Sequence, residues 1–186
     1  MVSSYISVMT ETNIETKIDP LVERFVLHWG EMGTRWGINR TVAQVHALLY
    51  LSPEPLNAED LVDRLGVARS NISTSLRELQ GWGIVRVTHK MGDRRDHFET
   101  TGDVWEMFRK ITEERKRREI DPTLELLRAL AVESKGGDAF VRSRIGALAE
   151  FFETIDAWYR DITRLPQAAL IQFLKLGGKI RKFILR

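Results

Sequence analysis

Residues 68–81 combine apolar side chains with potential nucleic-acid-binding side chains at helical spacing. Ile72, Leu76 and Leu79 recur after four and three residues, which places them on one side of a helix. The remaining positions offer short polar side chains and arginines that suit phosphates and base edges: Arg69, Ser70, Asn71, Ser73, Thr74 and Arg77. A helix of this kind fits the major groove of double-stranded DNA. The alternative is that these side chains only face water.

A basic hairpin is predicted directly after this polar helix. Gly83 precedes a β-branched strand over residues 84–90, residues 91–96 form the turn, and residues 97–100 return as the second strand. Ahead of the polar helix, Gly66 supplies a sharp turn after another short helix. The order helix, glycine turn, helix and hairpin is that of a winged helix-turn-helix.

The tip of the hairpin carries two adjacent arginines. Arg94 and Arg95, with Lys90 just before them, place positive charge where it suits the backbone or the minor groove of DNA. Asp93 is expected to start the turn, and Asp96 to orient an arginine through a bidentate pair. The alternative is a solvated turn whose local ion pairs contribute little.

Three helices are predicted ahead of the polar helix. Asp19, followed by a proline, caps the first, and either Asn39 or Thr41 begins the second. Asn57 caps the short third helix over residues 58–65. The expected fold class is mainly α: a winged helix-turn-helix with a two-stranded β-hairpin wing and flanking helices that form a dimerisation region.

The C-terminal half predicts four further helices. One covers residues 103–118, the next starts at Asp121, the longest follows Asp138, and the last follows Pro166. The longest helix carries an apolar seam that repeats every 3.5 residues, which is typical of packing between helices. Its members are Val141, Ile145, Leu148, Phe152, Ile155, Tyr159 and Ile162. The seam predicts a dimer interface, and packing within one chain is the alternative.

These elements divide the chain into five expected parts. They are a flexible N-terminal tail (1–18), an N-terminal packing helix (19–38), a winged helix-turn-helix domain (39–101), a helical dimerisation region (102–178) and a basic C-terminal tail (179–186). The glycine pair at 177 and 178 is expected to end the last helix and release the basic tail. Met9 is an alternative start of the chain.

Composition and charge narrow the class of protein. The 186 residues are 43% hydrophobic and 29% charged, as in ordinary globular domains, and the lack of cysteine excludes disulfides and thiolate metal sites. No apolar run approaches the roughly 20 residues that span a bilayer, and the first residues do not resemble a secretory signal, so we expect a cytoplasmic protein with no membrane association. Residues 67–118 carry 12 basic and 8 acidic side chains, and residues 164–186 carry 6 basic and none acidic. Such gathering of positive charge is expected of a polyanion binder.

Residues 40–100 resemble the GbsR/MarR group of bacterial and archaeal regulators. The matching segments are Arg40-Thr41-Val42-Ala43, residues 48–56, residues 67–82 with Ser70-Asn71-Ile72-Ser73, and Gly92-Asp93-Arg94-Arg95-Asp96. The resemblance implies a homodimeric transcription regulator of double-stranded DNA, with repression as the expected outcome. It implies that the recognition helix 68–81 enters the major groove and that the wing 90–96 lies on the backbone or in the minor groove. A small-molecule effector of unknown identity is left open.

Other classes of function find less support in the residues. A winged helix can also dock protein or RNA instead of operator DNA, and a monomer in solution would favour that alternative. Four histidines lie on different predicted elements without metal-ligand spacing, and no glycine-rich phosphate loop appears. They are His28, His46, His89 and His97. We therefore expect no enzyme activity, no cofactor and no metal site, and we expect His28 and His46 to be packing or capping residues.

Five aromatic residues allow a ligand hypothesis. They are Trp29, Trp36, Trp105, Trp158 and Tyr159. Such rings can form a cage that binds a quaternary ammonium group through cation–π attraction. Aromatic residues at helical spacing more often form part of the core, and we expect that role here.

Overall fold

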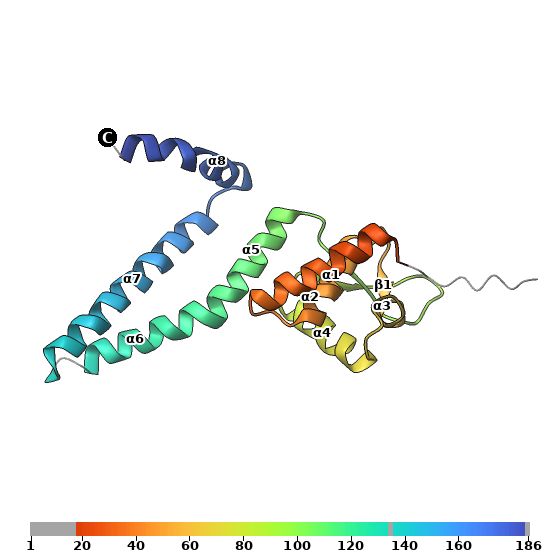
Figure 1. Ribbon diagram of the computed structural model, residues 1–186, viewed down its shortest axis with the longest axis horizontal. Coiled ribbons are helices and arrows are strands. Elements are labelled where there is room, and N and C mark those ends of the chain that lie inside the picture. Colours follow the sequence, from red (N-terminus) through yellow and green to blue (C-terminus); the bar gives the residue numbers. More distant parts are fainter. Residues whose placement is uncertain (1–17, 134–135, 185–186) are drawn as a thin grey trace, which may run out of the picture. The chain divides into compact units, whose positions relative to one another are not determined.

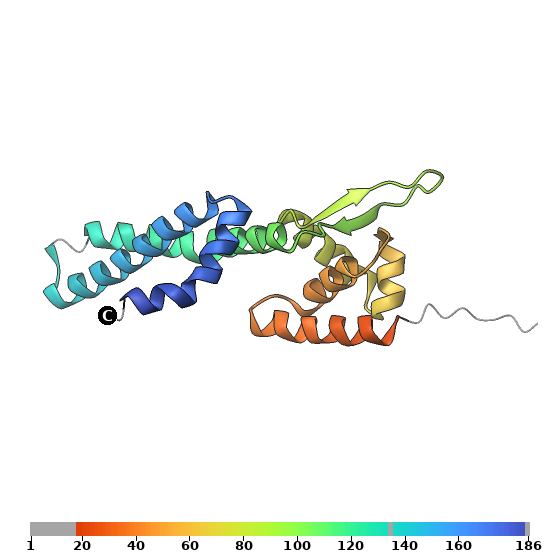
Figure 2. The same cartoon turned by 90° about the horizontal axis from the view of Figure 1, so that it is seen from above.

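The structure is a computed structural model that describes residues 18–133 and 136–184. It forms two compact units: unit 1 extends to Thr101, and unit 2 begins at Gly102 (Figures 1 and 2). The expected tail over residues 1–18 lies outside the described residues except for its last position. Among the helices of the described part, none has the length and apolar character needed to cross a membrane.

Two helices with predicted caps begin unit 1. Helix α1 (Pro20–Arg35) starts after Asp19, whose carboxylate accepts a hydrogen bond from the backbone N–H of Leu21 at 2.7 Å. Helix α2 (Arg40–Tyr50) starts after Asn39, whose side chain accepts from the N–H of Thr41 at 2.8 Å. Asn39, not Thr41, is therefore the cap, because its side-chain oxygen reaches the free donors of the first turn.

Helices α1 and α2 approach each other closely at two glycines of α1. A Cβ atom at Gly33 would lie 2.5 Å from the Cβ of Ala43 on α2. A Cβ atom at Gly30 would instead lie 2.7 Å from the Cγ of Gln44, which belongs to a flexible side chain. The packing of the two helices therefore depends on the missing side chain at Gly33.

Helices α3 (Ala58–Leu65) and α4 (Arg69–Gly81) form the helix-turn-helix. Asn57 and Asp60 form a reciprocal capping box at the start of α3, with both hydrogen bonds at 3.0 Å. Gly66 ends α3 with a φ of 63°, a left-handed conformation that glycine adopts without a steric penalty. This confirms the sharp turn that the sequence predicts between the two helices.

The wing belongs to a three-stranded antiparallel sheet, whereas a two-stranded hairpin was predicted. The two-residue strand β1 (Leu56–Asn57) pairs with β3 (His97–Thr100), and β3 pairs with β2 (Val85–Thr88). So short a strand has no readable periodicity, because it forms only where tertiary packing brings it beside β3. The loop that joins β2 and β3 projects from unit 1 (Figure 2).

The core of unit 1 gathers aliphatic side chains from all four helices and the sheet. Its most enclosed members are Val42, Val45, Leu48, Leu61, Ile72 and Leu79. Helix α2 lies at the centre of this core, because it packs against α1, α3, α4 and β3. The edge of α4 that carries the predicted apolar positions is thus buried, as the sequence predicts.

Unit 2 begins with one continuous helical rod instead of the two separate helices predicted (Figure 1). Helix α5 (Val104–Arg115) continues through a π-helical turn, η1 (Lys116–Ile120), into α6 (Asp121–Glu133). Asp121 does not cap a new helix; its N–H donates to the carbonyl of Lys116, five residues back. Because Pro122 lacks an N–H, the regular ladder is interrupted here, and a wide turn carries the helix past it.

The last two helices also differ from the predictions at one point. Helix α7 (Ala139–Thr163) is capped by Asp138, as expected, and packs along α6. Helix α8 (Gln167–Ile184) continues through the glycine pair that was predicted to end it, so residues 179–184 are not a tail. Each glycine lowers helix stability by only about 1 kcal/mol relative to alanine, and the good helix formers on both sides of the pair compensate for this cost.

We predict that Gly33→Ala destabilises unit 1. The new methyl group would overlap Ala43, and such overpacking costs about 1–3 kcal/mol. Gly30→Ala is the matched control, because Gln44 can move aside and alanine favours the helix. Urea unfolding followed by circular dichroism measures both changes. Equal urea midpoints for Gly33→Ala and Gly30→Ala would contradict the prediction, because they would show that α1 and α2 can move apart to accommodate the new methyl group.

We also predict that His46 makes stability fall in acid. Its side chain is buried, its Nε2 has no hydrogen-bond partner within the described residues, and burial lowers its pKa to about 4. Between the ordinary value of 6.5 and about 4, the unfolded chain binds a proton that the folded chain does not. Stability should therefore be full above pH 6.5 and fall by about 3 kcal/mol as the pH drops to 4.

The measurement is urea unfolding across this pH range. His46→Leu should lose this part of the pH dependence, while His28→Leu, at an exposed position of α1, should retain it. Equal slopes for wild type and His46→Leu would contradict the assignment.

Candidate nucleic-acid interface

Helix α4 presents two chemically different sides. Ile72, Leu76 and Leu79 are buried on one side. All six predicted contact residues of this helix are exposed: Arg69, Ser70, Asn71, Ser73, Thr74 and Arg77. Their exposure follows from the burial of the apolar edge, since side chains about half a turn away must point outward. Donors and acceptors of several kinds are therefore available along one exposed helical surface.

Arg77 is supported by neutral groups of its own helix. Its Nε lies 3.4 Å from the carbonyl oxygen of Ser73, and its Nη2 donates to the Thr74 hydroxyl at 3.3 Å. These bonds orient the guanidinium group without neutralising its charge. Arg77 therefore retains a full positive charge on the exposed side of α4.

The tip of the wing places its basic residues unequally. Arg94 is exposed, and the structure gives it no ion pair within the described residues. The Nζ of Lys90 lies 3.8 Å from the carboxylate of Glu54, and the two side chains are 42% and 75% exposed. Exposed pairs at this distance are weak, so Lys90 and Arg94 both remain accessible to an anion.

Arg95 is held by Asp93, where Asp96 was expected to orient an arginine. The guanidinium group donates from Nε at 2.9 Å and from Nη2 at 2.6 Å to the two oxygens of Asp93. Asp93 also accepts from the backbone N–H of Arg95 at 3.0 Å, which closes the turn as predicted. Hydrogen bonds from Arg95 hold the pKa of Asp93 well below its usual range. Asp96 instead lies 3.8 Å from His89.

His97 connects this turn to the sheet. Its buried ring places Nδ1 3.0 Å from the carbonyl oxygen of Arg95 and Nε2 3.5 Å from the carboxylate of Asp93. Because His97 belongs to β3, these contacts fix the turn relative to the strand. His97 is thus a structural residue of the wing, and its isolated position in the sequence carried no signal of that role.

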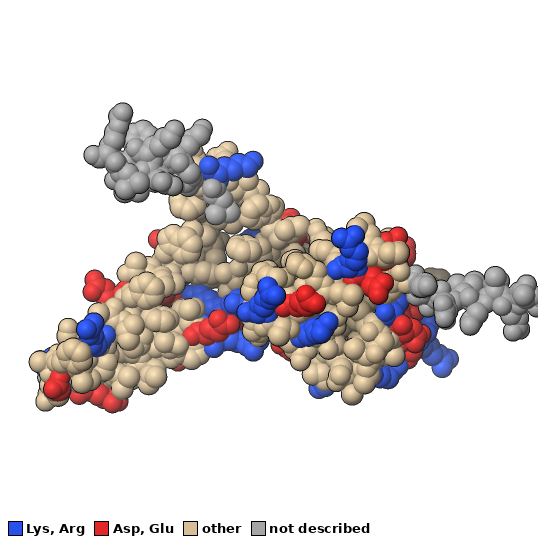
Figure 3. All heavy atoms as spheres, viewed as in Figure 1, with Lys and Arg blue, Asp and Glu red and all other residues tan. Residues whose placement is uncertain are grey.

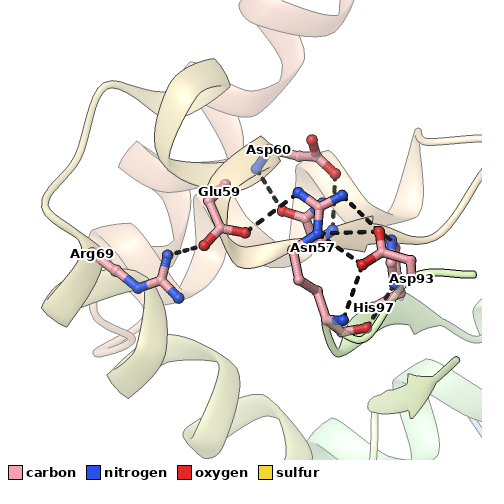
Figure 4. Close-up of polar contacts among 7 residues, drawn as sticks. Asn57, Glu59, Asp60, Arg69, Asp93 and His97 are labelled. Carbon is pink, nitrogen blue, oxygen red and sulfur yellow. Dashed lines mark hydrogen bonds and ion pairs between the residues drawn. The ribbon is translucent and has the colours of Figure 1, made fainter.

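Glu59 joins the start of α4 to the wing, and sequence reasoning missed it. Its carboxylate forms a hydrogen-bonded ion pair with Nη1 of Arg69, and its other oxygen lies 3.7 Å from Nη1 of Arg95. Figure 4 shows Glu59 between Arg69 and the group around Asp93 and His97. Because one carboxylate contacts both arginines, the start of α4 and the wing lie side by side. The hydrogen bond from Arg69 lowers the pKa of Glu59, so its charge persists at neutral pH.

Carboxylates consequently lie among the predicted basic contact residues of unit 1. In the view of Figure 3, lysine and arginine side chains alternate with aspartate and glutamate side chains over this unit. Three of the five predicted cationic contact residues face a carboxylate: Arg69, Lys90 and Arg95. Arg77 and Arg94 do not, within the described residues, so the local charge is set by tertiary contacts as well as by composition.

Four of the five aromatic residues considered for a ligand cage contact a ring or a cation of their own unit, whereas Trp158 is exposed. Trp29 stacks on Phe25 at 5.4 Å between ring centroids and meets Trp36 edge-on at 6.0 Å, all on or next to α1. In unit 2, Lys116 lies 5.5 Å from the centroid of the Tyr159 ring, so a cation of the chain itself occupies that face. Within the described residues no group of three or more acidic or histidine side chains is arranged to hold a metal ion.

Unit 2 exposes an apolar stripe on α7. Phe140, Phe151 and Trp158 are 67%, 58% and 57% exposed, and their intervals are close to whole helical turns, so they share one face. The predicted seam lies beside this stripe. Its central residues from Phe152 to Tyr159 are partly covered within the chain, whereas Val141 and Leu148 are exposed. Some of the seam therefore packs inside unit 2, and an uncovered apolar face remains.

Comparison with known proteins matches this architecture. The sequence model of the MarR family matches residues 36–96, which contain α2, the helix-turn-helix and the wing up to its turn. The chain is 24% identical over 93 residues to the "Putative HTH-type transcriptional regulator YvaV" of Bacillus subtilis (strain 168), a match over 50% of this chain. The chain spans about half the length of this curated relative, 52%.

A solved structure shares the fold over most of the chain. It is described as "Crystal Structure of a transcriptional regulator", and the superposition has a TM-score of 0.63 at 20% sequence identity. The match covers 84% of this chain and 99% of the other. Residues 36–96 are thus similar in sequence to the MarR family, and they adopt a winged helix-turn-helix fold.

Proposed function

We propose that this chain is a transcription regulator that binds double-stranded DNA in a sequence-specific manner and acts as a homodimer. The observation that carries the proposal is the exposed polar side of α4 beside the basic turn of the wing. Helix α4 would enter the major groove, where Asn71 suits adenine and Arg69 suits a guanine edge or a phosphate. The wing would lie on the backbone or in the minor groove, with Arg94 and Lys90 as its phosphate contacts.

The exposed stripe of α7 supports the homodimer in the proposal. Specific dimers bury about 1,600 Å² of surface, and their central contacts are rich in aromatic side chains. Phe140, Phe151 and Trp158 offer such side chains on one face. A two-fold dimer would present two copies of α4 to successive turns of DNA, which multiplies the number of bases read. Repression and control by a small-molecule effector belong to the proposal on the strength of the family match alone.

We predict that Arg94→Gln reduces the salt dependence of DNA binding. For each phosphate that the protein no longer neutralises, the slope of log K against log salt concentration should decrease by about one unit, whatever the sequence of the duplex. The measurement is fluorescence anisotropy with a mixed-sequence duplex over a range of salt concentrations. Arg86→Gln is the matched control, because Arg86 lies in the same hairpin and pairs with Glu99 at 2.8 Å. An unchanged slope for Arg94→Gln would remove the wing from the interface.

We predict that Trp158→Glu converts the dimer into a monomer. A carboxylate in the middle of the apolar stripe would lose its water on dimerisation, which opposes association. Sedimentation velocity at micromolar concentration distinguishes the two states. Ala157→Glu adds the same charge at a neighbouring exposed position off the stripe and should leave the dimer intact. A monomeric wild-type protein would instead favour a winged helix that docks protein or RNA.

A further inference from the structure

Two of the arginines that the sequence predicts to contact DNA are already bound by carboxylates of their own chain. Glu59 contacts Arg69 and Arg95, and Asp93 holds Arg95 from the other side. We propose that Glu59 is an internal competitor of DNA phosphate for Arg69 and Arg95, and that it thereby limits binding to the DNA backbone. The inference rests on the proposed DNA-binding function and adds a residue that opposes it.

Each guanidinium nitrogen of Arg95 faces a carboxylate, two of them through hydrogen bonds and one at ion-pair distance. A guanidinium group donates from three nitrogens in a fixed plane. Asp93 takes Nε and Nη2, and Nη1 lies 3.7 Å from the carboxylate of Glu59. A phosphate oxygen that approaches Nη1 would be repelled by the nearby carboxylate of Glu59, so Glu59 opposes phosphate binding at this nitrogen.

Arg69, at the start of α4, also pairs with Glu59. Its Nη1 donates to the carboxylate of Glu59, while its side chain stays 61% exposed and that of Glu59 44% exposed. The first turn of this 13-residue helix has free N–H groups and the positive end of the helix dipole, and its cap residue Ala68 supplies no side-chain acceptor. An anion is therefore favoured here, and Glu59 supplies one from within the protein.

Exposure makes this contact exchangeable and not a fixed part of the core. Ion pairs between exposed side chains are weak, so a DNA phosphate can replace Glu59, but each replacement first breaks an existing pair. Arg77 and Arg94 face no such exchange, because no carboxylate holds them within the described residues. Glu59 thus determines how many of the arginines are available to attract the phosphates of the DNA backbone.

A purely positioning role for Glu59 leads to the opposite result. If Glu59 only held the two arginines in the orientation that DNA requires, its removal would weaken binding. If it competes with phosphate, its removal frees donors and strengthens binding. The direction of the change therefore separates the two roles.

The test is Glu59→Gln, with a short mixed-sequence duplex as the probe. We expect the affinity to rise about three- to tenfold, and the slope of log K against log salt to steepen by about one unit for each arginine released. Asp63→Asn is the matched control, since it removes the same charge from an exposed position on the same helix. The control should change the affinity by less than about twofold and leave the slope unaltered.

A second pair of variants tests whether the gain in DNA affinity acts through Arg69. In an Arg69→Gln background, the part of the gain from Glu59→Gln that acts through Arg69 should disappear, because the group released is absent, and only the part that acts through Arg95 should remain. Thermal unfolding confirms that each variant is folded. Affinity that falls, stays the same, or rises only as much as in Asp63→Asn overturns the competitor role while DNA binding stands. A wild-type protein and a Glu59→Gln variant that both fail to bind the duplex at low salt overturn the proposed function as well.

Discussion

The burial of one edge of α4 is the constraint on which the candidate interface depends. Ile72, Leu76 and Leu79 are almost fully shielded from water by α2 and α3, and each such burial contributes about 1.5–3 kcal/mol. Rotation of α4 would expose these side chains, so the helix has only one stable orientation. The burial of the apolar edge is therefore sufficient to place the arginines and the short polar side chains of α4 on the exposed side.

A second constraint is the network that joins α3, α4 and the wing. The capping box of Asn57 and Asp60 fixes the start of α3, which places Glu59 within reach of Arg69. Asn57 is also part of β1, which pairs with the first residue of β3 at His97. A single short segment therefore sets the position of a helix, a strand and the carboxylate between two arginines.

Net charge is a poor guide to the electrostatics of this surface. The segment with the recognition helix and the wing is basic in composition, yet several of its cations are paired with carboxylates that lie close in space. Asp93 is close to Arg95 in sequence, and its effect is local. Glu59 lies far from Arg95 in sequence, and its effect arises only in the folded chain. Attraction of a polyanion therefore depends on which pairs the fold creates.

Unit 2 combines an enclosed ion pair between its helices with an apolar face that is exposed to water. Lys116 in the π-helical turn, 18% exposed, pairs with Asp121 and, at 2.9 Å, with Asp156 of α7, so one ammonium group ties the rod to the helix that runs back along it. The pairing raises the pKa of Lys116 and lowers that of Asp156, so both stay charged. By contrast, α6 does not cover the apolar stripe of α7, and the side chains of Phe151 and Trp158 remain exposed to water.

Local rules determined much of this fold from the sequence alone. The caps at Asp19 and Asn57, the turn at Gly66 and the two sides of α4 were all readable, because each depends on residues within one or two turns. Asn39 was one of two candidates for the cap of α2. The winged helix-turn-helix followed from their order, and the family match confirms it.

Tertiary structure alone decided the features that join distant segments. Strand β1 needed β3 beside it, and Glu59 needed both Arg69 and Arg95 within reach. The choice of Asp93 over Asp96 as the partner of Arg95 also depended on the three-dimensional path of the turn. Sequence periodicity reports which side of an element is apolar, but a contact between elements depends on distances that only the packed chain defines.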